Sequence, residues 1–320
     1  MSQDAGRRAC AVGSSLITIA FALCCVPPAR AQQSHPAQIS SLKDVPVTDS
    51  LAAAVARVKS DAAGRAPAAP AKSGEEEEDF IKPDRPTVAS PAEIQKPGVL
   101  QVEFGYDGNF RSEEFRAEHT APLSLRFAAS SRLLLAFEID SFKSETDNET
   151  RERRAGVGDA RLGFQIVALK DTEAHPALAF SYRLKLPAAS ERKRLGTGRF
   201  DHELLFLLSK KIGKTDFDFN AGFLADGEEG GAGWDHGGLA AFAVSREFEN
   251  DFGVEAEISG MSLDARLPRG LYALGSLNYK VNRRLRLDWG VRFGLNPEAP
   301  RAGVFGGLSV GVADLYRRAK

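Results

Sequence analysis

The sequence has few cysteines, and none of them lies in the body of the chain. All three, Cys10, Cys24 and Cys25, precede residue 26 of the 320. The rest of the chain therefore contains neither a disulfide framework nor a thiolate metal site. Proteins that cross an oxidising compartment unfolded commonly contain no cysteine.

Long apolar runs and an excess of one charge are also missing. Beyond the N-terminus, no stretch comes near the roughly 18 apolar residues that a membrane-spanning helix needs. The 42 Lys and Arg are matched by 43 Asp and Glu, so the net charge is −1. This balance gives no indication of nucleic acid as a partner.

The N-terminus has the three parts of a secretory signal peptide. Arg7 and Arg8 precede an apolar run from Ala9 to Val26, and an Ala-x-Ala sequence ends at Ala31. This order predicts a signal peptide over residues 1–31, cleaved after Ala31. An uncleaved N-terminal anchor is the alternative, but the apolar run is short for one.

Residues 32–97 differ in composition from the rest, with many Ser, Ala, Pro and Gln residues. Residues 66–71 have a linker composition, and residues 75–79 form an acidic block that stays solvated. Between residues 49 and 58, apolar residues share one face of a possible short helix. The segment is predicted to be a weakly ordered periplasmic linker, and a periplasmic contact or small plug is the alternative.

From Gly98 onward, apolar and polar residues alternate with a period of two. In residues 285–296 every odd position is apolar and every even position is polar or glycine. Side chains alternate across a strand, so one face of this segment is wholly apolar. Its length suits a tilted membrane strand better than a mean globular strand. Because the other face carries many charges, a membrane barrel is favoured over a soluble β-sandwich.

Residues 98–320 are therefore predicted to form an all-β domain, a transmembrane antiparallel up-and-down barrel. Twelve strands are expected, an even number as bacterial single-chain barrels require. Their ranges are 98–107, 118–129, 132–142, 157–169, 176–187, 200–212, 216–225, 237–248, 252–261, 270–281, 285–296 and 302–313. Short and long connections alternate, which predicts periplasmic turns and extracellular loops.

The same alternation assigns charged side chains to the inside of the barrel. The predicted lumen-lining residues are Arg126, Glu138, Arg161, Arg183, Lys185, Glu203, Asp216, Asp218, Glu255, Glu257, Arg286, Asp288 and Arg292. One interpretation is a polar conduit whose fixed charges select permeants. The other is a mostly closed interior whose charges pair with one another. A twelve-strand barrel is intermediate in width, so both remain open.

No group of residues indicates catalysis, a metal or a cofactor. His202 is predicted on the apolar face and Ser209 on the inner face near the other end of the same strand, so the two cannot meet. The histidines lack metal-ligand spacing, and residues 226–237 do not match a calcium loop. An enzyme, in particular a lipid hydrolase, is therefore not expected.

Several short motifs resemble one family in their order and spacing. They begin with Asp84-Arg85-Pro86 and Pro97-Gly98, and continue with Gly156-Val-Gly-Asp159, residues 184–187, residues 208–213 and Leu287-Asp-Trp-Gly290. Together they resemble the family named "putative MetA-pathway of phenol degradation" over about residues 84–312. The resemblance implies an outer-membrane barrel that handles small organic, often aromatic, compounds. Members usually end on an aromatic residue, whereas this chain continues past Tyr316 to Lys320.

The expected function is a channel or transporter for small organic compounds in the outer membrane of a Gram-negative cell. A structural or surface-interaction barrel with a closed lumen and binding loops is the alternative. The expected partners are outer-membrane lipid and lipopolysaccharide, a small-molecule permeant and the barrel assembly machinery, and no nucleic acid.

Overall fold

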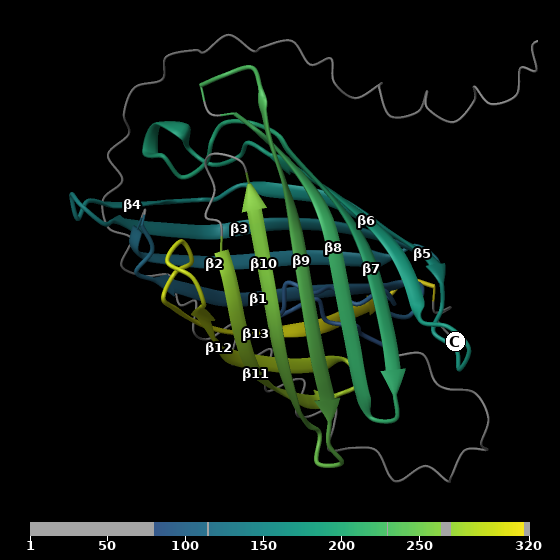
Figure 1. The fold of residues 1–320 in the computed structure, drawn as a ribbon. Coiled ribbons are helices and arrows are strands. Elements are labelled where there is room, and N and C mark those ends of the chain that lie inside the picture. The colour runs from purple at the N-terminus through teal and green to yellow at the C-terminus, as the bar shows by residue number, and fades with distance from the viewer. Residues whose placement is uncertain (1–79, 114, 229, 264–269, 317–320) are drawn as a thin grey trace, which may run out of the picture. The chain divides into compact units, whose positions relative to one another are not determined.

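The computed structural model describes residues 80–113, 115–228, 230–263 and 270–316 (Figure 1). The predicted signal peptide, the possible short helix and most of the predicted linker lie outside these residues. The strands are β1 (Val99–Phe110), β2 (Phe115–Ala128), β3 (Leu133–Asp147), β4 (Arg153–Gly156), β5 (Ala160–Leu169), β6 (Ala177–Leu186), β7 (Asp201–Ile212), β8 (Thr215–Gly227), β9 (Trp234–Glu247), β10 (Phe252–Leu263), β11 (Gly270–Asn282), β12 (Leu285–Gly294) and β13 (Ala302–Asp314). A 3-10 turn, η1 (Glu191–Lys193), precedes β7.

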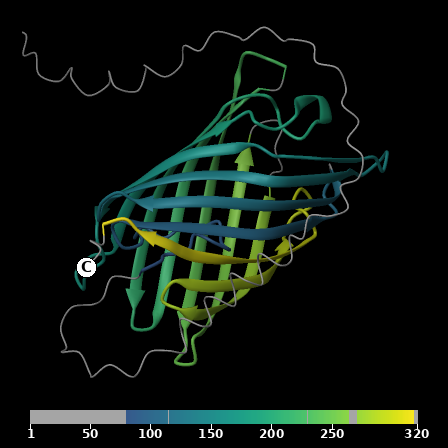
Figure 2. The same ribbon diagram turned by 180° about the vertical axis from the view of Figure 1, so that it is seen from behind.

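The strands form one closed antiparallel barrel (Figures 1 and 2). Each strand pairs with its neighbour in sequence, except that β5 pairs with β3 and not with β4, and β1 pairs with β13 to close the ring. Both β4 and β5 pair with β3, so they are two halves of one strand interrupted at residues 157–159. The ring therefore has twelve positions, which confirms the predicted fold and strand count.

The two ends of the barrel differ in their connections. Residues 129–132, 213–214, 248–251 and 283–284 make short turns at one end, which we call the turn end. Longer connections, such as 187–200, lie at the opposite end, which we call the loop end. In barrels of this kind the short turns are periplasmic and the long loops extracellular.

The burial pattern is the reverse of that of a water-soluble protein. Large apolar side chains on the outer wall are exposed, for example Phe180 at 45%, Ile258 at 57% and Phe293 at 52%. Charged and amide side chains inside are buried, including Arg126 and Glu103, each 2% exposed. An apolar exterior and a polar interior are the signature of a barrel that faces lipid. In the described part of the chain, no helix is long and apolar enough to cross a bilayer.

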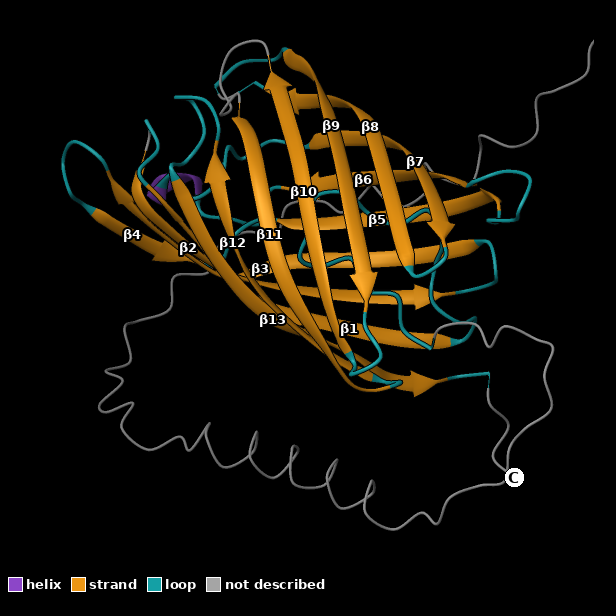
Figure 3. Ribbon diagram, turned by 60° about the horizontal axis from the view of Figure 1, so that its bottom comes forward, coloured by secondary structure: helices purple, strands orange, loops and turns teal. Residues whose placement is uncertain are grey.

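Residues 80–97, which we call the plug, lie inside the ring of strands. Their trace is the dark blue irregular segment seen between the strands in Figures 1 and 2, and the view of Figure 3 shows the ring around it. The prediction of a linker through residue 97 is therefore wrong for this part, which takes the alternative form of a plug. The irregular backbone is tolerated at this depth because protein, and not lipid, surrounds it.

A charge placed on the outer wall tests the assignment of this face to lipid. Ile258 lies in the middle of β10 and points outward. Ile258→Lys should lower the free energy of unfolding in lipid vesicles by about 2–4 kcal/mol, because the ammonium would enter hydrocarbon. Urea titration in vesicles measures the change, with Ile258→Leu as the matched control. Equal stability of the two variants would contradict a lipid-facing wall.

Candidate functional site

The plug is held in the lumen through its own backbone. Side chains of the barrel accept hydrogen bonds from its N–H groups, at 2.9 Å from Lys82 to Gln101, 2.8 Å from Ala89 to Glu257 and 2.7 Å from Ala92 to Ser209. The acceptors belong to β1, β10 and β7, so the plug crosses the lumen from one wall to the others. An irregular segment of this kind makes no regular backbone hydrogen bonds with a neighbouring strand. The inward-facing polar side chains of the barrel supply partners for its backbone groups instead.

Asp84 is the charged centre of the plug. Its carboxylate lies 3.2 Å from the Arg183 guanidinium and 3.9 Å from that of Arg126. Burial opposes the charge of Asp84, but Arg126 and Arg183 outweigh this effect and hold its pKa below the usual value. The backbone N–H of Asp84 also donates to Glu103, at 3.1 Å, and Glu103 in turn pairs with Arg126, at 3.1 Å.

Arg183 joins the plug to three strands. From β6 it contacts Glu203 of β7 at 3.0 Å and Glu138 of β3 at 3.8 Å. It also donates to the Ser90 hydroxyl of the plug at 3.1 Å. These groups are largely shielded from bulk water. Removing any one of them would therefore leave a shielded charge without its partner, which destabilises the protein.

Arg85 fixes the plug against the strands that close the barrel. Its guanidinium pairs with Asp288 of β12 at 3.4 Å. It lies so close to β1 and β13 that a Cβ on Gly105 or Gly307 would come within 2.4 Å or 2.7 Å of it. The two glycines therefore make room for Arg85 at this point.

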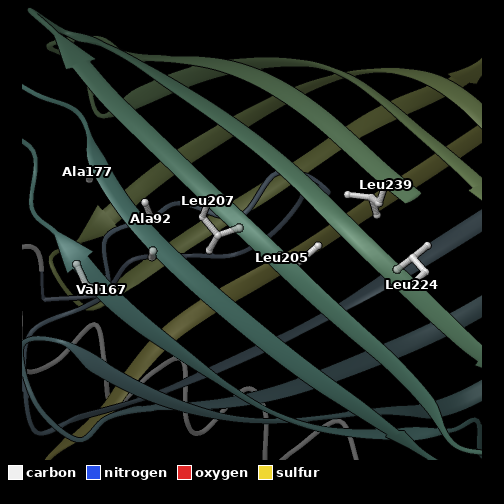
Figure 4. Packing of buried hydrophobic residues seen from close by; sticks show 8 residues of the cluster. Ala92, Val167, Ala177, Leu205, Leu207, Leu224 and Leu239 are labelled. Atoms are coloured by element: carbon white, nitrogen blue, oxygen red, sulfur yellow. The ribbon is translucent and has the colours of Figure 1, made fainter. Parts of the chain in front are cut away.

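One part of the inner wall is apolar, which the sequence reasoning did not predict. Leu205 and Leu207 of β7, Leu224 of β8 and Leu239 of β9 form a buried cluster with Ala92 of the plug (Figure 4). Residues 204–208 are apolar at every position, so apolar side chains occur on both faces of this strand. That continuous run was the available signal that a polar lumen would be interrupted here.

Cavities remain on both sides of the plug. The turn-end cavity measures about 450 Å³ and is lined by charged groups of both signs. On the loop side, cavities of about 330 Å³ and 280 Å³ share Asp140, Arg161, Arg183, Glu203 and Met261. We call these two together the outer chamber.

The connection 187–200 folds back over the outer chamber. The Ala189 N–H donates to Asp159 at 2.9 Å, and Lys185 donates to Thr197 at 3.2 Å. Leu195, which is 2% exposed, lines the chamber together with Thr197. The chamber is thus bounded by the plug on one side and by this loop on the other.

The structure places the predicted lumen residues on the inner wall and divides them among these features. Glu138, Arg161, Arg183, Lys185 and Glu203 line the outer chamber, and Asp216, Asp218, Glu255, Arg286 and Asp288 line the turn-end cavity. Arg126 and Glu257 hold the plug, while Arg292 pairs with Asp107 nearer the loop end. Their role in selecting permeants stays a prediction. The sequence reasoning did not identify the plug residues as their partners.

Three histidines belong to aromatic contacts on the outer wall near the loop end. His119 and His202 each bond a tyrosine hydroxyl at 2.7 Å, and His236 stacks on Phe223. Ser209 lies inside, bonded to Asp218 and to the plug. Among the described residues, no group of His, Cys, Asp and Glu side chains is arranged to hold a metal ion.

Comparison with known proteins identifies the family and supports the fold. The model of the family described as "Putative MetA-pathway of phenol degradation" matches residues 83–311, a range that includes most of the plug. No curated protein matches the sequence.

Three solved structures are similar to this chain. The COG4313 outer membrane channel from Pseudomonas putida F1 superposes with a TM-score of 0.53 at 13% identity, covering 68% of this chain and 97% of that one. The KdgM porin superposes with a TM-score of 0.46 at 9% identity, covering 67% of this chain and 99% of the porin. Outer membrane phospholipase A from Escherichia coli superposes with a TM-score of 0.40 at 13% identity, covering 75% of this chain and 97% of the phospholipase.

The Asp84 contacts predict how firmly the plug is held and how this depends on pH. Asp84→Asn should lower the free energy of local opening of residues 80–97 by about 1–3 kcal/mol at pH 7, because Arg126 and Arg183 each lose the charged partner that the plug supplies. A lowered pKa means that this stabilisation is present above the ordinary value of 3.8 and is lost as pH falls through the lowered value. Wild type and variant should therefore converge in acid.

Hydrogen exchange of the plug peptide, corrected for the intrinsic exchange rate at each pH, measures this opening. Glu149→Gln, in an exposed loop, is the control and should leave the exchange unchanged. Identical protection in Asp84→Asn and wild type at pH 7 would show that the carboxylate does not hold the plug.

Proposed function

The chain belongs to the family described as "Putative MetA-pathway of phenol degradation", and from this membership we propose that it is an outer-membrane channel for small organic compounds. The observation that carries the proposal is a closed barrel with cavities on both sides of a segment that is held by side chains alone. The COG4313 protein, which has the same fold, is an outer membrane channel, and this supports the proposal.

The plug is the gate of this channel. Apart from its chain connection to β1 at Gly98, it is held by hydrogen bonds, ion pairs and a few apolar contacts, and it pairs with no strand. Its first and last residues both lie near the turn end, where Phe80 packs on Val99 and Lys96 pairs with Asp314 at 2.9 Å. Withdrawal toward the turn end would therefore open the lumen without breaking the barrel's ladder.

A barrel that stays closed and works through its loops is the second candidate. The network around Arg183 and the inward fold of residues 187–200 favour it, because both fill space that a permanently open pore would leave free. Catalysis is not part of either proposal. Ser209 and His202 occupy opposite faces of β7, which gives no nucleophile with an adjacent base.

The proposed setting is the outer membrane, reached by export through the periplasm and by the barrel assembly machinery. Lipopolysaccharide is a proposed lipid partner at the loop end. Arg111, Arg116 and Arg301 surround one concavity there, beside the exposed apolar wall. Phosphate groups would find guanidinium partners at this position.

A disulfide that ties the plug to the wall tests the gate. Ala89 of the plug belongs to one buried cluster with Ala241 and Ala243 of β9. The chain beyond Cys25 has no cysteine that could interfere. In planar bilayers, the oxidised Ala89→Cys/Ala241→Cys variant should lose at least about nine-tenths of the wild-type conductance, since a covalently held plug cannot leave. A reducing agent should restore the conductance.

Each single-cysteine variant is the matched control and should conduct like wild type under both conditions. Undiminished conductance of the cross-linked protein would rule out the plug as the gate. Absence of conductance and of solute uptake in wild type itself would overturn the channel and leave the closed barrel.

A further inference from the structure

The outer chamber contains charged side chains that are not in direct contact with a group of opposite charge. Arg161 of β5, Asp140 of β3 and Asp226 of β8 make no side-chain hydrogen bond and no ion pair within 4.0 Å among the residues that the structure describes, although Arg161 attracts both carboxylates over a longer distance. All three line the chamber. Their neighbours differ in this respect, because Arg183 is engaged by Glu203 and Asp84, and Lys185 by Asp159 and Asp201.

Arg161 and Asp140 lie close enough to bind one small molecule together. Arg161 is paired across the ladder with Glu138, and Asp140 is the next inward residue beyond Glu138 on β3. Diagonal neighbours of this kind have Cα atoms about 7–8 Å apart. The guanidinium and the carboxylate do not form an ion pair, so a group that carries both charges can sit between them.

The opposite side of the same chamber is largely apolar, with Asp226 as its charged member. Met261 of β10 lines both of its cavities, Leu224 lines one and Leu239 the other. Val88 of the plug completes this surface. A ligand here would place an apolar body against Met261 and its charged end toward Arg161. Small-molecule sites usually combine an apolar lining with a few polar groups that orient the ligand in this way.

We infer that the outer chamber is a binding site for an amphipathic zwitterion, an α-amino acid with a large apolar side chain. Its carboxylate pairs with Arg161, its ammonium with Asp140, and its side chain packs on Leu224, Leu239 and Met261. This inference rests on the proposed channel function and names the class of its permeant.

The charges of the chamber favour a zwitterion over a simple ion. An organic anion would satisfy Arg161 but face the unpaired carboxylates of Asp140 and Asp226. An organic cation would satisfy Asp140 but leave the Arg161 guanidinium next to a like charge. Each mismatch costs free energy where water is scarce. A molecule with an ammonium and a carboxylate on the same carbon atom satisfies both side chains.

A matched series of ligands tests this choice with the purified full-length chain in detergent micelles. L-phenylalanine, 3-phenylpropanoate and phenethylamine share one apolar body and carry a zwitterion, an anion and a cation. Isothermal titration, corrected with empty micelles, should show L-phenylalanine binding about tenfold or more tightly than either of the others. Glycine, which lacks the apolar body, should not bind measurably.

Two variants give a crossed control. Arg161→Gln should weaken L-phenylalanine and 3-phenylpropanoate about tenfold, because the carboxylate contact is lost, and should strengthen phenethylamine, because a like charge is removed. Asp140→Asn should weaken L-phenylalanine and phenethylamine and should strengthen 3-phenylpropanoate, which no longer faces that carboxylate. The mobility difference between boiled and unboiled protein on a denaturing gel verifies that each barrel is folded.

Binding does not depend on conduction, so the two proposals can fail separately. Equal or tighter binding of phenethylamine or of 3-phenylpropanoate overturns the zwitterion site, as does a lack of the crossed pattern. If none of the ligands binds but the barrel conducts, the site is wrong and the channel stands. If L-phenylalanine binds as expected but no solute crosses, the site stands and the channel fails.

Discussion

Closure of the ladder between β1 and β13 is the constraint on which the rest of the structure depends. A bilayer offers no partner to a free backbone N–H or C=O, so the sheet can cross it only as a ring without an edge. The ring fixes which side chains meet lipid and which are confined together. The many charged groups confined inside the ring require partners of opposite charge. The plug supplies two of these partners, Asp84 for Arg183 and Arg85 for Asp288.

The sequence was sufficient for the barrel because its signal is local. Alternation in a segment such as residues 285–296 assigns each side chain to a face without reference to any other strand. The same rule placed Arg183 and Asp218 inside and His202 outside. The departures from the predicted set are the break between β4 and β5, which splits one strand into two, and the extension of β3 and β4 beyond the predicted ranges 132–142 and 157–169.

The plug and the apolar inner patch could not be predicted in this way. Residues 80–97 have no period, and their partners lie far along the chain, as in the contact of Ala89 with Glu257. A Pro-rich irregular segment looks the same in sequence whether it is solvated or enclosed. Leu205 and Leu239 become one surface only when their strands are placed side by side, so their joint role required the structure.

The position of the plug in the chain has a consequence for assembly. The plug comes before every strand, yet the groups that hold it come from β1, β2, β6, β7, β10 and β12. Its cradle does not exist until the last of these strands has joined the ring. The plug must therefore wait for strands that follow it in the chain, and its seating becomes the final event of folding, an internal check that the ring has closed in the correct register.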